Sequence, residues 1–364
     1  QQRMRPGLER RIDAVLRHGK YILGPEVTEL ETALAAFVGA RACISCASGT
    51  DALLMALLAL DIGPGDAVFT SPFSFVATTE TIVLAGGTPV YADIDPDTFN
   101  LDAASLQQAI ERVRTEGRLR PAAIMPVDLF GLPADYDALC PLAEAHGLPI
   151  IQDAAQAFGA TLHGRRLPTQ GTIGCTSFYP AKPLGGYGDG GACFTDDPTL
   201  AERLRSIRVH GMGATQYDTR RIGINGRLDT LQAAIVMEKL RHYPAEIARR
   251  QTVAGWYCEA TGHLPGLRLP RIPQGRQSVY AQFTVRHASR DALKAALENR
   301  GIPSAVYYPI PAHQTLAYQE RARYGALPKA ERACAEVLSL PFGPDLAQCD
   351  IERIGNAMTS ALTP

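Results

Sequence analysis

Several features are missing from this sequence of 364 residues, and each absence excludes a class of protein. A basic excess is missing, because the formal net charge is -1 at pH 7. Nucleic acid is therefore not expected as the main partner, since phosphate binding needs clustered positive charge. No run of about eighteen apolar residues occurs, so we predict no membrane-spanning helix and no membrane partner. Internal repeats and low-complexity segments are absent as well.

Cysteine is present, but it is not arranged as a metal-binding set. The eight cysteines are scattered, and only Cys43 and Cys46 are close together, in ACISCAS. A zinc site needs a second pair of cysteine or histidine ligands, so we interpret both as small residues of a buried strand and predict no metal. The first residues, QQRMRPGLERR, lack the apolar core of a signal peptide. Free cysteines without an export signal predict a cytoplasmic location.

Short apolar strands alternate with amphipathic helices over residues 25–240. This alternation is typical of an α/β protein whose mainly parallel sheet carries helices on both faces. Ligands of such sheets bind at the carboxyl ends of the strands, so the residues that follow each strand are candidate site residues. The predicted strands are 42–47, 66–71, 88–94, 122–127, 148–153 and 174–180, and the predicted helices are 27–39, 50–60, 75–86, 101–113 and 136–147.

The pattern changes after residue 240. A long helix over 243–261 leads to a Pro/Gly-rich segment at 264–275, a strand at 278–286 and a helix at 289–301. We therefore predict a large domain over residues 1–240 and a smaller α+β C-terminal domain over residues 241–364.

Small and aromatic residues follow the first two predicted strands. Ser48-Gly49-Thr50 opens a helix after strand 42–47, and the free N–H groups of a helix N-terminus form an anion site. Ordinary N-capping by Ser48 or Thr50 explains the same residues. Phe73 and Phe75 follow strand 66–71, where packing in the core is the alternative to a role in binding.

Asp153 and Lys182 are charged residues that lie in apolar segments of the sequence. Asp153 ends the buried strand 148–153 and is followed by Gln156; it either caps the next segment or meets a cation or donor, because a buried carboxylate is costly alone. Lys182 follows Ser177 in SFYPAKPLGGYGDGGACF, between two prolines. Burial lowers the pKa of a lysine and makes it a nucleophile that forms Schiff bases. Phosphate site, aromatic face, carboxylate and lysine together match pyridoxal 5'-phosphate.

The motifs that carry these residues resemble a known family. ILGPEVTELE, ASGTDAL, PFSFVATTETI, VDLFG, DAAQAFGA, SFYPAKPLGGYGDGGA and NGRLDTLQAAI are similar to those of the DegT/DnrJ/EryC1/StrS sugar aminotransferases, over nearly the whole chain. The resemblance implies fold-type I, as in aspartate aminotransferase: a mainly parallel seven-stranded sheet flanked by helices, with a smaller C-terminal domain.

The resemblance also implies a role for each candidate residue. Lys182 matches the lysine that forms the Schiff base with the cofactor, and Asp153 matches the carboxylate that pairs with its pyridine nitrogen. The remaining matches to cofactor contacts are Gly49, Thr50 and Ser177 at the phosphate, Gln156 at the ring hydroxyl, Phe75 stacked on the ring, and Asn225 from the neighbouring subunit. The last of these implies a homodimer with shared active sites.

The family chemistry is an exchange in two stages. L-Glutamate gives its amino group to the cofactor and leaves as 2-oxoglutarate, and the pyridoxamine 5'-phosphate form then aminates a nucleotide-linked keto sugar. Lys182, once released, is placed to move the proton between carbon atoms. Ping-pong kinetics are expected.

Members that act on UDP-2-acetamido-2-deoxy-3-oxo-D-glucuronate are especially similar, and they make a 3-amino sugar for bacterial surface polysaccharide such as O-antigen. Arg227 is our candidate for the carboxylate of this sugar, because guanidinium binds carboxylate through two hydrogen bonds; a dimer-interface ion pair is the alternative. Tyr308 and His313 match a segment that meets the sugar, and close relatives often have His where this chain has Tyr307. His210 is a further candidate substrate contact, with ordering of its loop as the alternative.

Four other functions stay open at this point. A different nucleotide-linked keto sugar, such as a dTDP-linked 3-keto- or 4-keto-6-deoxyhexose, is the first. Dehydratases of the family have His in place of the lysine, whereas this chain has Lys182. A non-catalytic regulatory protein would be expected to lack Lys182 or Asp153. A nicotinamide-dependent oxidoreductase would need GxGxxG between strand and helix, where this chain has ASGTDAL.

Overall fold

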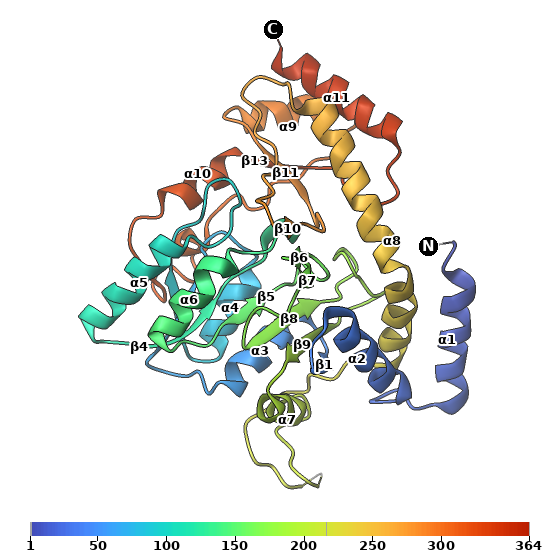
Figure 1. The fold of residues 1–364 in the computed structure, drawn as a ribbon, viewed down its shortest axis with the longest axis vertical. Helices are drawn as coiled ribbons and strands as arrows, with labels where there is room; N and C mark the ends of the chain where they lie inside the picture. Colours follow the sequence, from blue (N-terminus) through green and yellow to red (C-terminus); the bar gives the residue numbers. More distant parts are fainter. Residues whose placement is uncertain (1, 216, 364) are drawn as a thin grey trace.

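The computed structural model describes residues 2–215 and 217–363, and one twisted sheet lies at its centre (Figure 1). Two four-stranded halves, ordered β1-β9-β8-β5 and β12-β3-β2-β4, are joined where β4 meets β5 through the bridges Ile124↔Ile150 and Val127↔Asp153. The strands are β1 (Ala42–Cys46), β2 (Asp66–Thr70), β3 (Thr88–Tyr91), β4 (Arg120–Met125), β5 (Ile151–Asp153), β8 (Ile173–Ser177), β9 (Gly191–Thr195) and β12 (Arg323–Tyr324).

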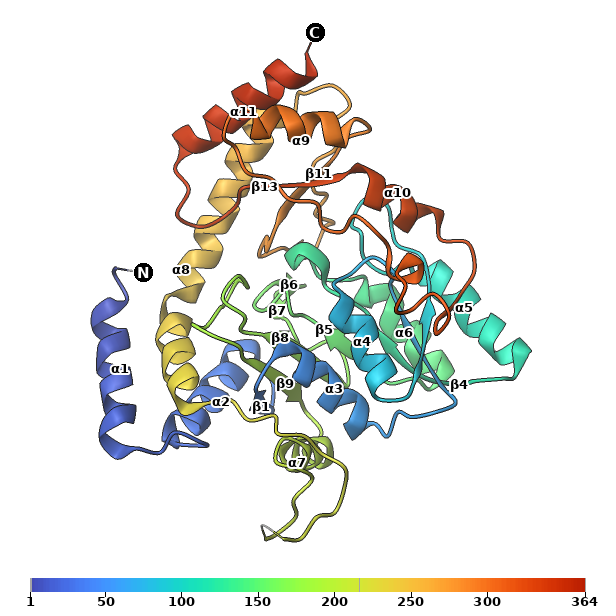
Figure 2. The ribbon, with the colours of Figure 1, turned by 180° about the vertical axis from the view of Figure 1, so that it is seen from behind.

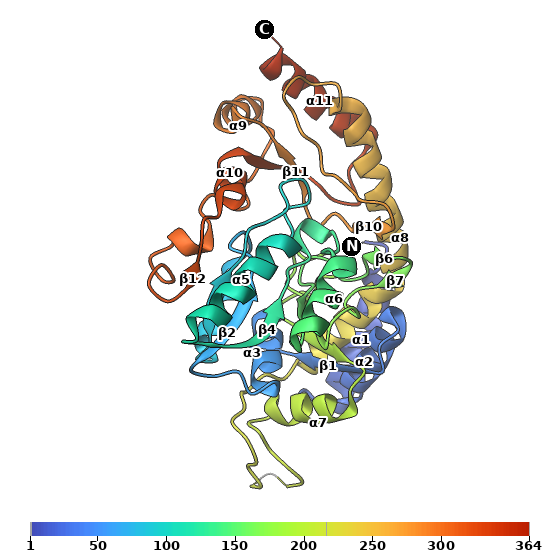
Figure 3. The ribbon, with the colours of Figure 1, turned by 60° about the vertical axis from the view of Figure 1, so that its left-hand side comes forward.

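The directions of these strands confirm the predicted sheet. All the pairings across it are parallel except the two made by β9, which runs antiparallel to both β8 and β1. Seven of the strands come from residues 42–195, as fold-type I requires, and β12 adds two residues from the C-terminal part at the edge beside β3. Figure 3 labels β12 at this edge, and Figure 2 shows the orange-red C-terminal segment that carries it from behind. β9 runs back antiparallel to β8, so the loop that joins them begins and ends at the carboxyl edge of the parallel strands.

Helices cover both faces of the sheet because successive residues of each strand point to opposite sides. Val68 packs in one apolar cluster with α3 and α7, whereas Ala67 and Phe69 pack in another with α5 and α6. The side chains of Cys43 and Cys46 also point to opposite faces of the sheet, so they lie in different buried clusters. The helices of this part are α2 (Pro25–Val38), α3 (Gly49–Ala59), α4 (Val76–Leu84), α5 (Ala103–Glu116), α6 (Tyr136–His146) and α7 (Pro198–Ile207).

The helix α8 (Thr230–Thr261) joins the sheet to the C-terminal part. Its first half packs with α2 on the sheet, and its second half packs with the C-terminal elements. The helix predicted over 243–261 therefore begins earlier, and it runs unbroken past residue 240, so the division into domains at that residue stays a prediction. The larger C-terminal elements are β11 (Phe283–Arg286), α9 (Arg290–Glu298), α10 (Pro328–Glu336), β13 (Val337–Leu340) and α11 (Gln348–Leu362).

Shorter elements complete the fold. Where a strand was predicted over 278–286, β10 and β11 are separated by an irregular segment in which Tyr280 has a positive φ of 46°. The short elements are β6 (Thr161–Leu162), β7 (Arg165–Arg166), β10 (Arg276–Gln277), η1 (Leu129–Gly131) and η2 (Ala312–Gln314). Throughout the two described ranges, no helix combines the length and apolar character needed to cross a membrane.

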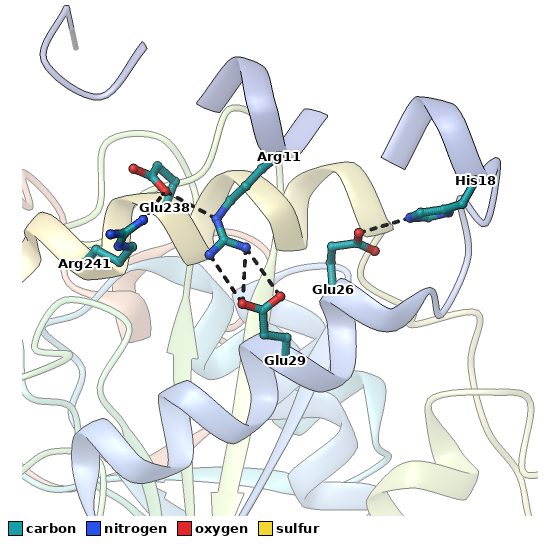
Figure 4. A network of polar contacts seen from close by, with 6 residues as sticks. All are labelled: Arg11, His18, Glu26, Glu29, Glu238 and Arg241. Atoms are coloured by element: carbon teal, nitrogen blue, oxygen red, sulfur yellow. Dashed lines mark hydrogen bonds and ion pairs between the residues drawn. The ribbon is translucent and has the colours of Figure 1, made fainter. Parts of the chain in front are cut away.

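The N-terminal helix α1 (Arg5–His18) is held against α2 and α8 by ion pairs (Figure 4). Arg11 donates from Nε to Glu238 of α8 at 3.3 Å and from its terminal nitrogens to Glu29 of α2. Burial opposes ionisation of Glu238, but the hydrogen bond from Arg11 and the charge of Arg241 outweigh it and lower the pKa of this carboxyl. Glu238 is therefore the ionised centre of the contact between α1 and α8.

We expect Glu238→Gln to lower the free energy of unfolding at neutral pH by about 1–2 kcal/mol, because hydrogen bonds to a buried charged group are lost. Urea denaturation monitored by circular dichroism measures the change. Glu9→Gln is the matched control, since Glu9 pairs with Arg5 on the exposed side of α1 and should matter by less than about 0.5 kcal/mol. Equal effects of the two substitutions would contradict this account.

Candidate active site

Loops from four strands that run in one direction meet at the carboxyl edge of the sheet. Gly49 follows β1, Asp128 follows β4, Asp153 ends β5, and Lys182 lies in the loop between β8 and β9. These strands run in the same direction, so the topology brings their ends together. The predicted gathering of polar residues at this edge is therefore present.

Asp153 is the buried carboxylate of the site, with 4% of its surface exposed. Thr78 of α4 donates to its Oδ2 at 2.8 Å, and the backbone N–H of Ala155 donates to Oδ1 at 3.2 Å. Burial raises the pKa of Asp153, while the two donors and the charge of Lys182 oppose the rise. The carboxylate is thus oriented by two hydrogen bonds and faces a cation.

Lys182 is the half-buried lysine opposite Asp153. Its backbone N–H donates to the carbonyl of Tyr179 at 2.8 Å, which closes a tight turn after β8. Burial lowers the pKa of Lys182, and the negative charge of Asp153 partly opposes this. A lowered pKa increases the fraction of neutral amine, which is the nucleophilic form of a lysine.

Gly49 and Ser177 form a narrow cradle at the N-terminus of α3. Ser48 caps the helix by accepting from the N–H of Asp51 at 3.0 Å, so the capping interpretation holds. A Cβ on Gly49 would lie 2.6 Å from the Cβ of Ser177, a distance that side chains do not adopt. The N–H groups of the first helical residues therefore face a space bounded by Ser177, which suits an anion.

Gln156 and Tyr308 form the opposite wall. The Oε1 of Gln156 accepts from the N–H of Phe130 at 2.7 Å, and its Nε2 donates to the hydroxyl of Tyr308 at 3.0 Å. Burial raises the pKa of Tyr308, so its hydroxyl stays protonated. Tyr308 comes from the C-terminal part of the chain, so this contact brings that part to the end of β5.

The two phenylalanines after β2 have different surroundings. Phe73 is buried in a cluster with Phe99 and Phe130, which agrees with the core alternative. Phe75 precedes α4 as its N-cap residue, and 53% of its surface is exposed although its ring centroid lies 6.5 Å from that of Tyr308. A largely exposed aromatic ring beside buried polar groups suits stacking on a planar ligand.

Among the described residues, four predicted ones make no hydrogen bond within this cluster. Arg227 donates from Nη2 to the Oδ1 of Asn225 at 2.6 Å, and both lie where the loop between α7 and α8 returns to the sheet, since the carbonyl of Gly226 accepts from the N–H of Ala47 at 3.0 Å. His210 is exposed in the same loop, with a left-handed φ of 62°. His313 is buried, and its Nε2 lies 3.1 Å from Glu331. In the part of the chain that the structure describes, the four make no hydrogen bond to Lys182, Asp153 or Gln156.

Asp128 is a buried polar residue whose role the sequence did not indicate. It accepts from the N–H of Ala134 and the Nε2 of Gln152, both at 2.8 Å, and from the hydroxyl of Tyr136 at 3.0 Å. Burial raises its pKa to about 7, although the three donors oppose the rise. Asp128 fixes the loop that offers the N–H of Phe130 to Gln156. Gln152 faces away from Asp153, because neighbouring strand residues alternate in direction.

Comparison with known proteins gives consistent matches over the whole chain. A model of the DegT/DnrJ/EryC1/StrS aminotransferase family matches residues 3–359. UDP-2-acetamido-2-deoxy-3-oxo-D-glucuronate aminotransferase of Pseudomonas aeruginosa is 48% identical over 361 residues, 99% of this chain and 97% of that protein. UDP-N-acetyl-3-dehydro-alpha-D-glucosamine 3-aminotransferase of Acidithiobacillus ferrooxidans is 42% identical, over 96% of this chain and 92% of that protein. A crystal structure of a DegT DnrJ EryC1 StrS aminotransferase from Brucella abortus has a TM-score of 0.97 at 45% identity, covering 100% of this chain and 97% of its own.

The raised pKa of Asp128 makes a pH-dependent contribution to stability. Because the folded-state pKa of about 7 exceeds the ordinary value of 3.8, the folded protein retains a proton that the unfolded chain loses. We expect the free energy of unfolding, relative to Asp128→Asn, to fall as the pH rises from about 4 to about 7, and then to level off. Denaturant titrations at a series of pH values measure this difference.

The matched control is Asp97→Asn, since Asp97 is partly exposed and pairs with Arg271. That substitution should leave the pH dependence of stability nearly unchanged. A difference between wild type and Asp128→Asn that does not vary with pH would contradict the assignment.

Proposed function

The chain belongs to the DegT/DnrJ/EryC1/StrS aminotransferase family, and we propose that it transfers an amino group from L-glutamate to the C3 ketone of UDP-2-acetamido-2-deoxy-3-oxo-D-glucuronate. The product is a 3-amino sugar of the kind used in bacterial surface polysaccharide such as O-antigen. The observation that carries the proposal is the pair of Lys182, with a lowered pKa, and buried Asp153. The near-complete match to a relative with this activity supports the choice of sugar.

Enzymes of this family use pyridoxal phosphate, and the residues at the sheet edge fit it. The cradle of Gly49, Thr50 and Ser177 suits the phosphate, since a Cβ on Gly49 would fill it. Asp153 suits the ring nitrogen, and Gln156 suits the ring hydroxyl. Phe75 offers an exposed ring for stacking.

When bound, the cofactor supplies an aldehyde that condenses with amines and a ring that withdraws electrons. The Asp153 carboxylate, held by Thr78 and Ala155, would accept a hydrogen bond from the ring nitrogen and stabilise a positive charge there. The neutral Nζ of Lys182 would take a proton from the α-carbon of the amino donor and later return one to the sugar carbon. The Tyr308–Gln156 contact closes one side of this space.

The proposal includes a homodimer with shared sites. Asn225 is exposed and accepts a hydrogen bond from the half-buried Arg227, whose Nε is buried without a hydrogen-bond partner. In such a dimer, Asn225 and Arg227 of each copy would reach into the site of the other copy. Asn225 would contact the cofactor phosphate, and Arg227 would bind the sugar carboxylate. Tyr308 is the proposed sugar contact within the same chain, and His210 and His313 are proposed to order the surrounding loops.

The first test is the visible absorption of the protein loaded with pyridoxal phosphate, followed as L-glutamate is added. We expect L-glutamate to bleach the visible band, and a suitable keto sugar to restore it. In Lys182→Ala, which has no lysine to move protons, the rate of bleaching should fall at least ~10²-fold. Lys294→Ala, which removes a surface lysine paired with Glu298, should bleach at the wild-type rate. A Lys182→Ala protein that bleaches as fast as wild type would overturn the mechanism.

The sugar is tested through Arg227. The two relatives act on a glucuronate and on a glucosamine, and only the first name carries a carboxylate. We expect Arg227→Met to lower kcat/KM for the 3-oxo-glucuronate by about 10- to 100-fold, because a charge-assisted pair is lost, and to affect the 3-oxo-glucosamine substrate far less.

Arg221→Met is the control for this experiment, since Arg221 lies in the same loop and faces Glu202. Wild-type enzyme that prefers the 3-oxo-glucosamine substrate would instead favour the second activity. A dTDP-linked 3-keto- or 4-keto-6-deoxyhexose is included as the third substrate.

A further inference from the structure

The loop that follows β4, residues 128–134, lies between the active site and the C-terminal part of the chain. The N–H of Phe130 donates to the Oε1 of Gln156 at 2.7 Å. The carbonyl of Phe130 accepts from the N–H of Ala281 at 2.9 Å. The backbone of Phe130 is therefore bonded to the site on one side and to the C-terminal part on the other.

The N–H of Phe130 determines which end of the Gln156 amide faces the cofactor. A backbone N–H can only donate, so the amide atom beside it must be the oxygen, Oε1. The Nε2 then carries its two N–H groups on the other side. One donates to the hydroxyl of Tyr308 at 3.0 Å, which leaves the other for the ring hydroxyl of pyridoxal phosphate. A reversed amide would instead bring its oxygen toward the ring oxygen, and two acceptors repel each other.

Asp128 holds both ends of this loop. Its own N–H donates to the carbonyl of Asp153 at 2.9 Å. Its buried carboxylate accepts from the N–H of Ala134 and the hydroxyl of Tyr136 at Oδ1, at 2.8 and 3.0 Å, and from the Nε2 of Gln152 at Oδ2, at 2.8 Å. Each oxygen thus meets an N–H donor. An amide in place of the carboxylate would set a second donor against one of them, whichever way it turned.

Asn100 holds the middle of the same loop. Its Oδ1 accepts from the N–H of Leu129 at 2.9 Å, and its Nδ2 donates to the carbonyls of Leu132 and Pro133 at 3.1 and 3.2 Å. The side chain is 2% exposed, so water does not replace these bonds. Between the bonded residues, Phe130 has a left-handed φ of 57°, which is uncommon for a residue other than glycine. Asn100 therefore supports this conformation from both sides.

We propose that Asp128 and Asn100 are positioning residues for amino transfer. They hold Phe130 so that the amide of Gln156 presents an N–H to the ring hydroxyl of pyridoxal phosphate. The inference rests on the proposed function, which places Gln156 beside the ring. A donor at the ring oxygen stabilises negative charge there. That charge depends on the donor most when the nitrogen that joins Lys182 to the cofactor has lost its proton, because this proton otherwise bridges to the same oxygen. The two residues therefore set the acidity of this nitrogen through Gln156.

The experiment is a pH titration of the visible absorption band of the protein loaded with pyridoxal phosphate, without amino donor or sugar. The band is lost as the nitrogen on Lys182 releases its proton. Gln156→Leu should raise the midpoint by about one pH unit, because the deprotonated form loses a hydrogen bond to a charged group. Asp128→Asn and Asn100→Ala should each raise the midpoint by about half a unit or more.

A double variant separates positioning from a direct effect of charge. Asp128 faces Tyr136 and Asp153, and Asp153 faces Lys182. Loss of a negative charge near the nitrogen would by itself lower the midpoint, because the protonated form would be destabilised. Positioning predicts the opposite sign. It also predicts that adding Asp128→Asn to Gln156→Leu changes the midpoint by less than about 0.2 units, since no amide remains to be oriented.

Two single variants complete the set. Tyr136→Phe removes one donor to Asp128 without removing a charge, so it should raise the midpoint by less than Asp128→Asn does. Asp66→Asn is the matched control, because Asp66 is a buried carboxylate that accepts from Gly63 and Arg120. It lies at the start of β2, at the opposite edge of the sheet, and should leave the midpoint within about 0.2 units of wild type.

The outcomes distinguish this inference from the proposed function. Wild-type midpoints in Asp128→Asn, Asn100→Ala and Tyr136→Phe, each folded by circular dichroism, would overturn the positioning role. An unchanged midpoint in Gln156→Leu would overturn the contact at the ring hydroxyl, and this inference with it. Neither result depends on L-glutamate or on the sugar. Failure of the proposed function would be seen separately, as a band that L-glutamate does not bleach.

Discussion

The pairing of a buried carboxylate with a half-buried lysine across one sheet edge is the constraint on which the rest of the site depends. Neither charge would be stable there alone, because burial raises the pKa of Asp153 and lowers that of Lys182. Each opposes the shift of the other. The surroundings therefore keep Asp153 oriented as an acceptor and favour the neutral, nucleophilic form of Lys182 more than water does, which is the combination that pyridoxal phosphate chemistry requires.

The topology of the sheet produces this pairing. Parallel strands place Gly49, Asp128 and Asp153 at one edge, and the reversal of β9 returns the chain so that the loop with Lys182 lies at that edge too. The C-terminal part reaches the same place through Tyr308, which accepts a hydrogen bond from Gln156. Each half of the chain thus supplies one side of a site that neither could form by itself.

Much of this arrangement follows from local sequence patterns. The alternation of apolar strands and amphipathic helices predicts the sheet, and small or charged residues after the strands predict the positions of Gly49, Asp153 and Lys182. Other features could not be predicted locally. Nothing in the sequence indicates that the hydroxyl of Thr78 donates to Asp153 Oδ2 at 2.8 Å. The VDLFG motif likewise does not indicate that Asp128 accepts three hydrogen bonds.

The central claim is that the amine of Lys182 is the one that holds the cofactor. The most direct measurement is to load the protein with pyridoxal phosphate, reduce it with sodium borohydride, and map the pyridoxyl group by mass spectrometry of peptides. The account predicts a single modified peptide, with the group on Lys182 between Pro180 and Pro183. A group found on another lysine, or no stable modification after reduction, would contradict it.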